Sequence, residues 1–228
     1  MIITIDGPAG TGKSTCAIRL AEKINFIYFD TGALYRAICL FAINSKINID
    51  CKDSLKKLVS RFKFQIKEIN KVPHYFVNDI DVTNEIRSPQ LTLQVSKFAS
   101  LETVRNALKP IQYDFGKNCN SIFDGRDLGT AIFPEADIKF FLTASSYIRA
   151  ERRHQELITK FPDKRVTFEQ TLSDINQRDY QDSTRTCAPL KKAHDAIEID
   201  TTTKTIEEVV GLMEKYYIEV ITHKTKGK

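Results

Sequence analysis

Residues 7–15, GPAGTGKST, have the residue types and the spacing of a loop that holds phosphate groups. They match the pattern G-x-x-x-x-G-K-[ST], with Gly7, Gly12, Lys13 and Ser14 at the defining positions. The glycines let backbone amides curl around phosphate oxygens, the lysine reaches the β- and γ-phosphates, and the serine hydroxyl suits Mg²⁺. We therefore predict that the segment binds a nucleoside triphosphate, the alternative being a glycine-rich turn that only caps a helix.

Strands and helices on either side of this loop must hold it in place. The β-branched run Ile2–Ile5 predicts a buried strand before the loop, and apolar residues at helical spacing predict a helix over residues 13–24. A second strand is predicted at 26–29, followed by a helix through about Ala42. Strand, loop and helix in repetition indicate a parallel α/β sheet.

The rest of the chain continues this pattern with one interruption. Further buried strands are predicted at 121–125, 138–144 and 196–200, and a last helix at about 205–221. Residues 62–82 instead alternate between apolar and polar positions around a turn, which predicts a small antiparallel sheet. Helical sequence returns from about Ser88 to Leu108.

Two predicted strands end in segments that carry arginine. DTGALYR, residues 30–36, places Arg36 one turn into a helix, and DGRDLGT, residues 124–130, places Arg126 and Asp127 at the carboxyl edge of the sheet. An enzyme that joins two polyanions needs such cations in addition to the loop lysine. The alternatives are a solvated helix residue for Arg36 and ordinary turn chemistry for the second segment.

More arginines follow on two predicted helices. A helix that begins after Ser145 and Ser146 carries Arg149, Arg152 and Arg153 on one face. A capping box at Thr167–Gln170 begins the next helix. If that helix continues, Arg178, Asp182 and Arg185 of RDYQDSTR fall within roughly 60° of one another on its surface. The alternative is an exposed ion pair.

Composition restricts the class of protein further. The chain has 228 residues, 42% hydrophobic and 28% charged, which is typical of a globular protein with a packed core. A net charge of +5 favours anionic ligands, but the scattered lysines give no nucleic-acid-binding pattern. Five cysteines without a C-x-x-C pair indicate reduced thiols. With no apolar run long enough for a membrane span, we expect a cytoplasmic protein, and a monomer because no heptad pattern is present.

The segments GPAGTGKST, DTGALYRA, VSKFASLETVRNAL, DGRDLGT and RDYQDSTRTCAPL, in this order, closely resemble those of bacterial-type cytidylate kinases, a family of P-loop nucleoside monophosphate kinases. The resemblance extends over nearly the whole chain, and the last two segments are its most specific part. It implies transfer of the γ-phosphate of ATP, with Mg²⁺, to CMP or dCMP. Another P-loop small-molecule kinase and a non-enzymatic nucleotide-dependent module remain as alternatives.

The resemblance also implies roles for individual residues. The ATP-binding positions are Gly7, Pro8, Ala9, Gly10, Thr11, Gly12, Lys13, Ser14 and Thr15, with Ser14 also assigned to Mg²⁺. The CMP-binding positions are Thr31, Arg36, Ser96, Arg105, Asp127, Asp182 and Arg185. The positions expected to act on the transferring phosphate are Lys13, Arg126, Arg178 and Arg185. Ser96 and Arg105 would lie on opposite sides of an ideal helix, so their convergence requires a kink or a helix end.

The implied fold is a P-loop kinase with a parallel five-stranded sheet flanked by helices, a small inserted antiparallel sheet and a helical lid. Within a single nucleotide kinase domain, the predicted core comprises about residues 1–61, 89–148 and 185–228. The predicted monophosphate-binding insert comprises about 62–88, and the lid about 149–184.

Overall fold

The computed structural model describes residues 1–70, 72–162 and 165–226. The chain folds as two compact units, one formed by residues 1–29 and 116–228 and the other by residues 30–115. Among the helices described, none is long and apolar enough to cross a membrane.

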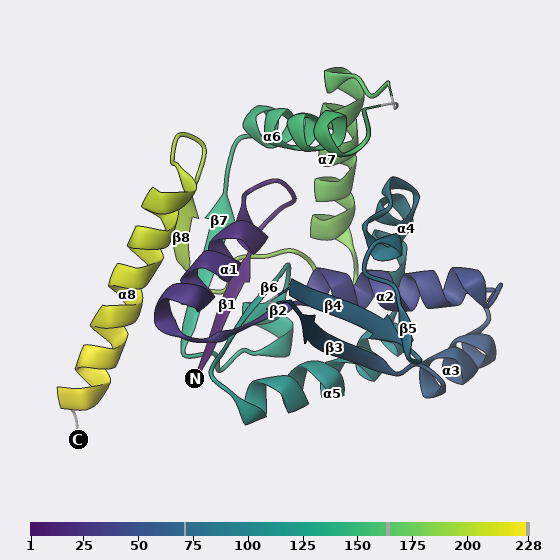
Figure 1. The fold of residues 1–228 in the computed structure, drawn as a ribbon, viewed down its shortest axis with the longest axis horizontal. Helices are drawn as coiled ribbons and strands as arrows, with labels where there is room; N and C mark the ends of the chain where they lie inside the picture. Colours follow the sequence, from purple (N-terminus) through teal and green to yellow (C-terminus); the bar gives the residue numbers. More distant parts are fainter. Residues whose placement is uncertain (71, 163–164, 227–228) are drawn as a thin grey trace. The chain divides into compact units, whose positions relative to one another are not determined.

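A parallel sheet forms the centre of the first unit (Figure 1). Its described strands, in spatial order, are β2 (Ile27–Asp30), β6 (Ser121–Gly125), β1 (Ile2–Asp6), β7 (Ile138–Thr143) and β8 (Ile197–Asp200). In β1, Ile5 lies opposite Asp124 of β6 and Phe140 of β7. The loop after β1 therefore begins at the middle of the carboxyl edge, where α/β sheets bind their ligands.

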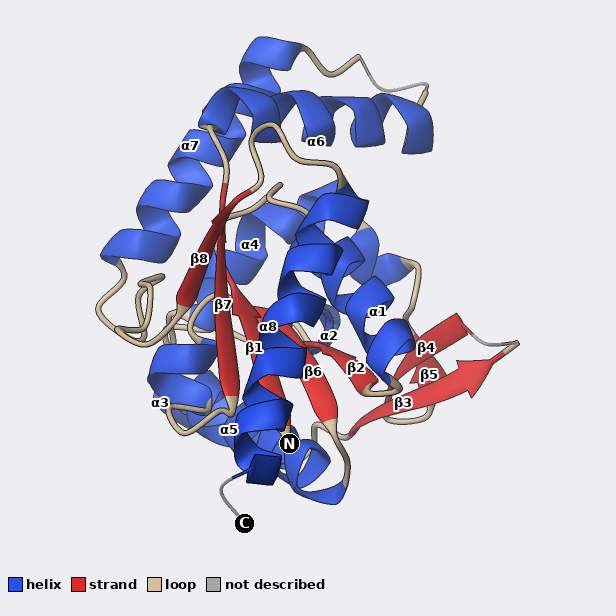
Figure 2. Cartoon of the chain, turned by 90° about the vertical axis from the view of Figure 1, so that its left-hand side faces the viewer, coloured by secondary structure: helices blue, strands red, loops and turns tan. Residues whose placement is uncertain are grey.

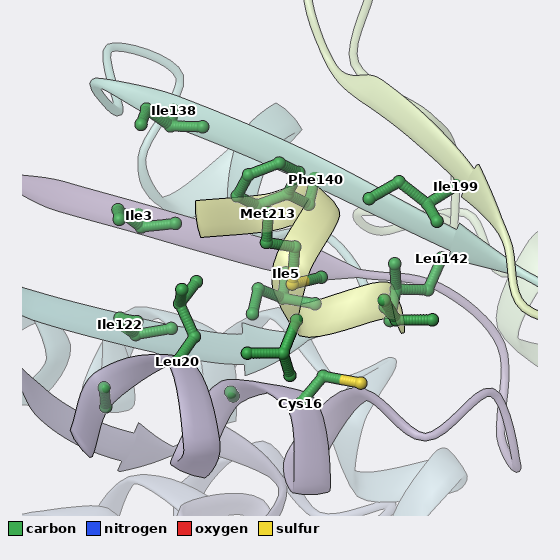
Figure 3. Packing of buried hydrophobic residues seen from close by; sticks show 14 residues of the cluster. Ile3, Ile5, Cys16, Leu20, Ile122, Ile138, Phe140, Leu142, Ile199 and Met213 are labelled. Atoms are coloured by element: carbon green, nitrogen blue, oxygen red, sulfur yellow. The ribbon is translucent and has the colours of Figure 1, made fainter. Parts of the chain in front are cut away.

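Two helices, α1 (Lys13–Ile24) and α8 (Ile206–Lys226), cover one face of this sheet (Figure 2). Because side chains alternate along a strand, Ile3 and Ile5 of β1 point to the same face. There they form a buried cluster with Leu20 of α1 and Met213 of α8 (Figure 3). Each fully buried side chain of this size stabilises the fold by about 1.5–3 kcal/mol, so the cluster fixes α1 against the sheet.

A pair of packed helices, α6 (Ser146–Lys160) and α7 (Phe168–Thr184), also belongs to the first unit. The Ser145 side chain accepts a hydrogen bond from the Ile148 amide at the start of α6. Thr167 and Gln170 exchange the two hydrogen bonds of a capping box at the start of α7. Both predicted helix starts are thus confirmed, because the capping signals are local.

The second unit contains helices and the small antiparallel sheet. Its elements are α2 (Thr31–Asn44), α3 (Lys52–Ser60), β3 (Phe64–Ile69), β4 (Val72–Val77), β5 (Ile80–Asp81), a 3₁₀ turn (Glu85–Arg87) and α4 (Pro89–Ala99), together with most of α5 (Glu102–Asn118). The described strands pair in the order β3, β4, β5. The alternating residues therefore form the antiparallel sheet that was predicted.

The helical sequence predicted from about Ser88 to Leu108 forms two helices in the structure, α4 and the first part of α5. The Ser100 amide is shared between the carbonyls of Ser96 and Lys97, and the Leu101 amide bonds back to Phe98. These tightened bonds end α4, so a new helix begins at Glu102. Helix α3 was not predicted, since its buried residues, Leu55 and Leu58, lie in a short lysine-rich segment.

The predicted fold class is confirmed: the described residues form a parallel sheet of five strands flanked by helices and a separate antiparallel sheet of three. The division into core, insert and lid at the boundaries given above stays a prediction. Residue 71 of the predicted insert and residues 163–164 of the predicted lid lie outside the described part of the chain.

We expect Gly7→Ala to lower the free energy of unfolding of the first unit by about 3 kcal/mol or more. Alanine would be strained in the positive-φ backbone of Gly7, and its Cβ would collide with a neighbouring carbonyl group. Gly7 has φ 144°, and an added Cβ would lie 2.1 Å from the carbonyl oxygen of Leu142. Urea unfolding of the nucleotide-free protein measures the change.

Gly211→Ala is the matched control for this variant. Nothing lies within 4 Å of a Cβ at Gly211, which is inside α8, so alanine there should stabilise the protein by roughly 0.5–1 kcal/mol. Equal midpoints for the two variants would contradict the assignment of strain to Gly7.

Candidate active site

The loop of residues 7–15 joins β1 to the first turn of α1. Gly10 and Gly12 have φ of 80° and 84°, values that L side chains rarely adopt. Within the described chain, no side chain caps the first turn of α1. Its amide groups and the positive end of the helix dipole are therefore available to an anion.

Lys13 lies buried at the beginning of α1, with 6% of its surface exposed. Its Nζ donates to the carbonyl oxygen of Pro8 at 2.6 Å and to Thr11 Oγ1 at 3.3 Å. Burial lowers the pKa of Lys13 well below its usual value, and Arg126 and Arg178 lower it further. A phosphate at this position would supply the negative charge that stabilises the ammonium group.

Ser14 and Asp124 form an oxygen-rich pair beside the loop. Ser14 Oγ donates to Asp124 Oδ2 at 2.6 Å, and the hydroxyl of Tyr28 donates to the other carboxylate oxygen at 2.9 Å. Hydroxyl and carboxylate oxygens are the ligands that Mg²⁺ prefers, so these residues fit the predicted metal. Asp124 was not among the predicted site residues, although the strand end in DGRD carried the signal.

The turn after β6 and the end of α7 are joined by ion pairs. Arg126 Nε lies 3.0 Å from Asp182 Oδ2, and Arg178 Nε lies 3.8 Å from the same oxygen. Arg185 Nη2 lies 2.8 Å from Asp127 Oδ1. The structure thus brings together all five of these predicted residues, and the exposed-pair reading of RDYQDSTR is wrong because Asp182 is only 3% exposed.

Asp182 remains a carboxylate although it is buried. Burial alone would raise its pKa, but Arg126, Arg178 and Arg185 together hold the pKa below its usual value. The three guanidinium groups outnumber the two carboxylates that pair with them, Asp127 and Asp182, so an excess of positive charge remains. The region can therefore accept a further anion.

Arg185 reaches this region in a different way from the one that helical spacing suggested. Helix α7 ends at Thr184, and Arg185 has an extended backbone as the C-cap residue. Its Nε donates to the carbonyl oxygen of Ala188 at 2.7 Å. The guanidinium is therefore oriented by the chain after the helix and not by the helix face.

The three arginines predicted to share one face of α6 separate in the structure. Arg149 donates to the carbonyl oxygen of Ala9 in the phosphate loop at 3.1 Å and pairs with Asp179 of α7 at 2.7 Å. Arg152 instead donates to Thr201. Arg153 pairs with Glu156 on its own helix, so Arg149 alone of the three joins the loop to α7.

The predicted CMP-binding residues of the second unit lie on three helices. Thr31 is buried at the start of α2, and Arg36, on the same helix, donates to the carbonyl oxygen of Ile86 at 3.3 Å. Ser96 lies on α4 and Arg105 on α5. The break between α4 and α5 supplies the helix end that a convergence of Ser96 and Arg105 requires.

Arg105 is held against its own unit by two contacts. Its Nη1 donates to the carbonyl oxygen of Ala99 at 3.1 Å, and its guanidinium lies 5.6 Å from the ring centroid of Tyr35. The side chain is 6% exposed. These contacts fix the guanidinium in one orientation, as recognition of an anionic or hydrogen-bonding ligand requires.

A further ion pair in the second unit was missed. Arg87 Nη2 lies 2.6 Å from Asp30 Oδ2, while the other oxygen of Asp30 caps α2 by accepting from the Ala33 amide. Half of the Arg87 side chain is exposed. The position of Asp30 at a strand end before Thr31 could have marked it as a site residue. No feature of the neighbouring sequence marked Arg87.

Comparison with known proteins agrees with these features. The family model for cytidylate kinase matches residues 3–219. The cytidylate kinase of Protochlamydia amoebophila is 46% identical over 218 residues, covering 95% of this chain and 96% of that protein. The cytidylate kinase of Fusobacterium nucleatum subsp. nucleatum is 42% identical over 215 residues, covering 94% and 96%. The one from Clostridium tetani is 45% identical over 228 residues, covering 100% and 98%.

The match therefore includes the phosphate loop, the Arg126–Asp127 turn, the end of α7 and the acceptor candidates of the second unit. Its extent and the identities show that the chain is an enzyme that belongs to the cytidylate kinase family.

Proposed function

We propose that the protein transfers the γ-phosphate of ATP to CMP or dCMP, giving ADP and CDP or dCDP. The observation that carries this proposal is the concentration of cationic side chains beside the phosphate loop, where Arg126 and Arg178 lower the pKa of the buried Lys13. Such a group of cations is stabilised by a polyanion, and a reacting pair of nucleotide phosphates supplies more negative charge than one nucleotide does.

The transfer needs little covalent chemistry from the protein. An oxygen of the CMP phosphate attacks the γ-phosphorus in line, and the bond from that phosphorus to the β–γ bridging oxygen breaks, so that ADP leaves with the electron pair. The attacking oxygen is already charged, so no strong base is required. The rate then depends on position and on electrostatic stabilisation of the transferring group.

We assign the donor side to the loop of residues 7–15. Its amides and Lys13 would hold the β- and γ-phosphates of ATP. Arg126, Arg178 and Arg185 would neutralise the charge that spreads over the transferring group. Asp182 would keep Arg126 and Arg178 in orientation, as its 3.0 Å and 3.8 Å contacts with them suggest.

Mg²⁺ would be held by Ser14 and Asp124, whose oxygens are 2.6 Å apart. When bound, the ion neutralises phosphate charge and helps to orient the β- and γ-phosphates. Tyr28 would keep Asp124 in place through the other carboxylate oxygen.

We assign the acceptor nucleotide to seven residues. They are Thr31, Arg36, Ser96, Arg105, Asp127, Asp182 and Arg185. Helices α6 and α7 would act as a lid whose closure excludes water and so prevents transfer of the phosphate to water. The ion pair from Arg149 to Asp179 and the Arg149 contact with Ala9 support a coupling of this lid to the phosphate loop.

We further propose that the protein acts as a monomer in the cytoplasm, in pyrimidine nucleotide metabolism, without a nucleic-acid partner. All five cysteines are free thiols, which fits a reducing compartment. The modest net charge of +5 fits small anionic substrates.

Release of ADP with a panel of monophosphates tests the substrate. We expect kcat/KM for CMP and dCMP to exceed that for AMP by at least about tenfold, because a site built to hydrogen-bond one base leaves polar groups unpaired with another. ATP without an acceptor is the control for hydrolysis. Equal use of AMP would assign the protein to a different nucleotide specificity.

Arg185→Ala should lower kcat by at least about 10²-fold, because a positioned cation on the transferring phosphate is lost. Arg185→Lys should recover only part of the rate, since lysine lacks the planar fork. Arg61→Ala, at an exposed arginine after α3, is the matched control. Near-normal turnover by a folded Arg185→Ala protein would remove Arg185 from the mechanism.

Ser14→Ala and Asp124→Asn should each weaken the dependence of ATP affinity on Mg²⁺, because each removes an oxygen ligand. Calorimetric titration of ATP with and without Mg²⁺ measures the effect. Tyr28→Phe is the control, since it removes a hydrogen bond to Asp124 but no proposed ligand. Wild-type dependence in both ligand variants would contradict the assignment.

A further inference from the structure

Asp6 is a buried carboxylate at the end of β1, and its hydrogen bonds go to the turn that carries Arg126 and Asp127. The Leu128 amide donates to Asp6 Oδ1 at 3.0 Å, and the Gly129 amide donates to Asp6 Oδ2 at 2.8 Å. Both carboxylate oxygens are thus bonded to consecutive amides of one segment. The side chain is 3% exposed, so water cannot easily replace these bonds.

The segment that Asp6 holds has an unusual backbone. Residues Leu128–Ile132 form a π-helical turn, in which the Phe133 amide bonds back to the carbonyl of Leu128 at 2.6 Å. Turns of this kind are rare and occur frequently at functional sites. The two amides that bond to Asp6 belong to the first residues of this turn, directly after Arg126 and Asp127.

The far end of the same segment is held separately. Lys139 of β7 donates its Nζ to the carbonyl oxygen of Pro134 and to Asp195. Asp6 therefore fixes the near end of the segment, where the charged residues lie, and Lys139 fixes the far end. Two different strands of the sheet support the two ends.

Arg126 and Asp127 in turn bind the end of α7. Arg126 pairs with Asp182 at 3.0 Å, and Asp127 pairs with Arg185 at 2.8 Å. A shift of the turn would move both pairs, and a displacement of about 1 Å can reduce a rate by as much as 10²-fold. The Asp6 carboxylate thus adds a side-chain link between β1 and these four charged side chains to the backbone ladder that joins β1 to β6.

From these contacts we infer that Asp6 is a positioning residue for phosphoryl transfer, which acts by fixing the turn that carries Arg126 and Asp127. The inference rests on the proposed function. It does not require Asp6 to touch either nucleotide.

A buried carboxylate is costly to the fold, which argues against a purely stabilising role. Burial raises the pKa of Asp6 to about 7, and the nearby Asp127 also raises it, while the amides of Gly129 and Leu128 and the charge of Lys13 lower it. A side chain that favours the neutral form in the fold opposes folding when it is ionised. Its two bonds to the turn are the compensating contacts.

Asp6→Asn tests the inference because it keeps the size of the side chain but replaces one acceptor with an amide group. We expect kcat to fall at least about tenfold while KM for ATP stays within about twofold. The melting temperature should remain within about 4 °C of the wild type. A folded Asp6→Asn protein with kcat within about twofold of the wild type would overturn the inference.

Thr4→Val is the matched control. Thr4 lies on the same strand and points to the same side as Asp6, and its Oγ1 is buried without a hydrogen-bond partner in the described part of the chain. This variant should keep wild-type kcat and KM. A tenfold loss in Thr4→Val as well would assign the effect of Asp6→Asn to general disturbance of the strand.

A double-mutant cycle with Arg126→Ala distinguishes an effect of Asp6 on the position of the turn from a general disturbance of the fold. If Asp6 acts through the turn, Asp6→Asn should lower kcat by a smaller factor when Arg126 is already absent, because only the Asp127–Arg185 pair then remains to be displaced. The same tenfold loss in both backgrounds would overturn the inference. Wild-type protein that turns over no monophosphate would instead refute the proposed function.

Gly129→Ala disturbs the contact between Asp6 and the turn by changing the turn and leaving Asp6 in place. It tests the inference if Asp6→Asn does not fold. An added Cβ would lie 3.4 Å from Asp6 Oδ2, 3.1 Å from Lys139 Cδ and 3.3 Å from Thr4 Oγ1. Contacts at these distances require shifts of only a few tenths of an ångström, so the fold should survive while the turn moves. We expect the same loss of kcat without a change in KM for ATP, and an unchanged kcat would overturn the inference.

Discussion

The concentration of positive charge at the carboxyl edge of the parallel sheet is the constraint on which the rest of the first unit depends. Lys13 is buried there, and both Arg126 and Arg178 lower its pKa. The positive charges of Lys13 and these two arginines repel one another, and the repulsion is stronger in the protein interior, where the dielectric constant is low, than in water. The fold therefore holds these cations together against their repulsion, and a phosphate brought to this edge would relieve it.

Two carboxylates make this arrangement possible within the fold. Asp182 accepts from Arg126 and lies near Arg178, and Asp127 pairs with Arg185. Buried ion pairs contribute little net stability because of the cost of desolvation, but they restrict geometry strongly. Their value here lies in orientation, since catalysis by electrostatic stabilisation requires charges that are fixed before the reaction.

Local signals account for the structural features that the sequence predicted well. The phosphate loop, the capping box before α7 and the strand ends are encoded within a few consecutive residues. The position of the break between α4 and α5 was not predicted, because it depends on a shared amide at Ser100. The role of Asp124 and the different partners of Arg149 and Arg152 were missed because those partners lie on other segments of the chain: Ser14 for Asp124, Ala9 and Asp179 for Arg149, and Thr201 for Arg152. Arg153 pairs with Glu156 on its own helix.

The sequence by itself determined the fold class, the phosphate loop and the types of charged residue available for phosphoryl transfer. These follow from periodicity, glycine placement and motif spacing, which depend on neighbouring residues. Only the tertiary structure decided that Arg126, Asp127, Arg178, Asp182 and Arg185 form neighbouring, partly buried ion pairs. It also decided that Asp6 holds the turn that carries two of these residues, because hydrogen bonds and ion pairs between distant segments exist only once the sheet has formed.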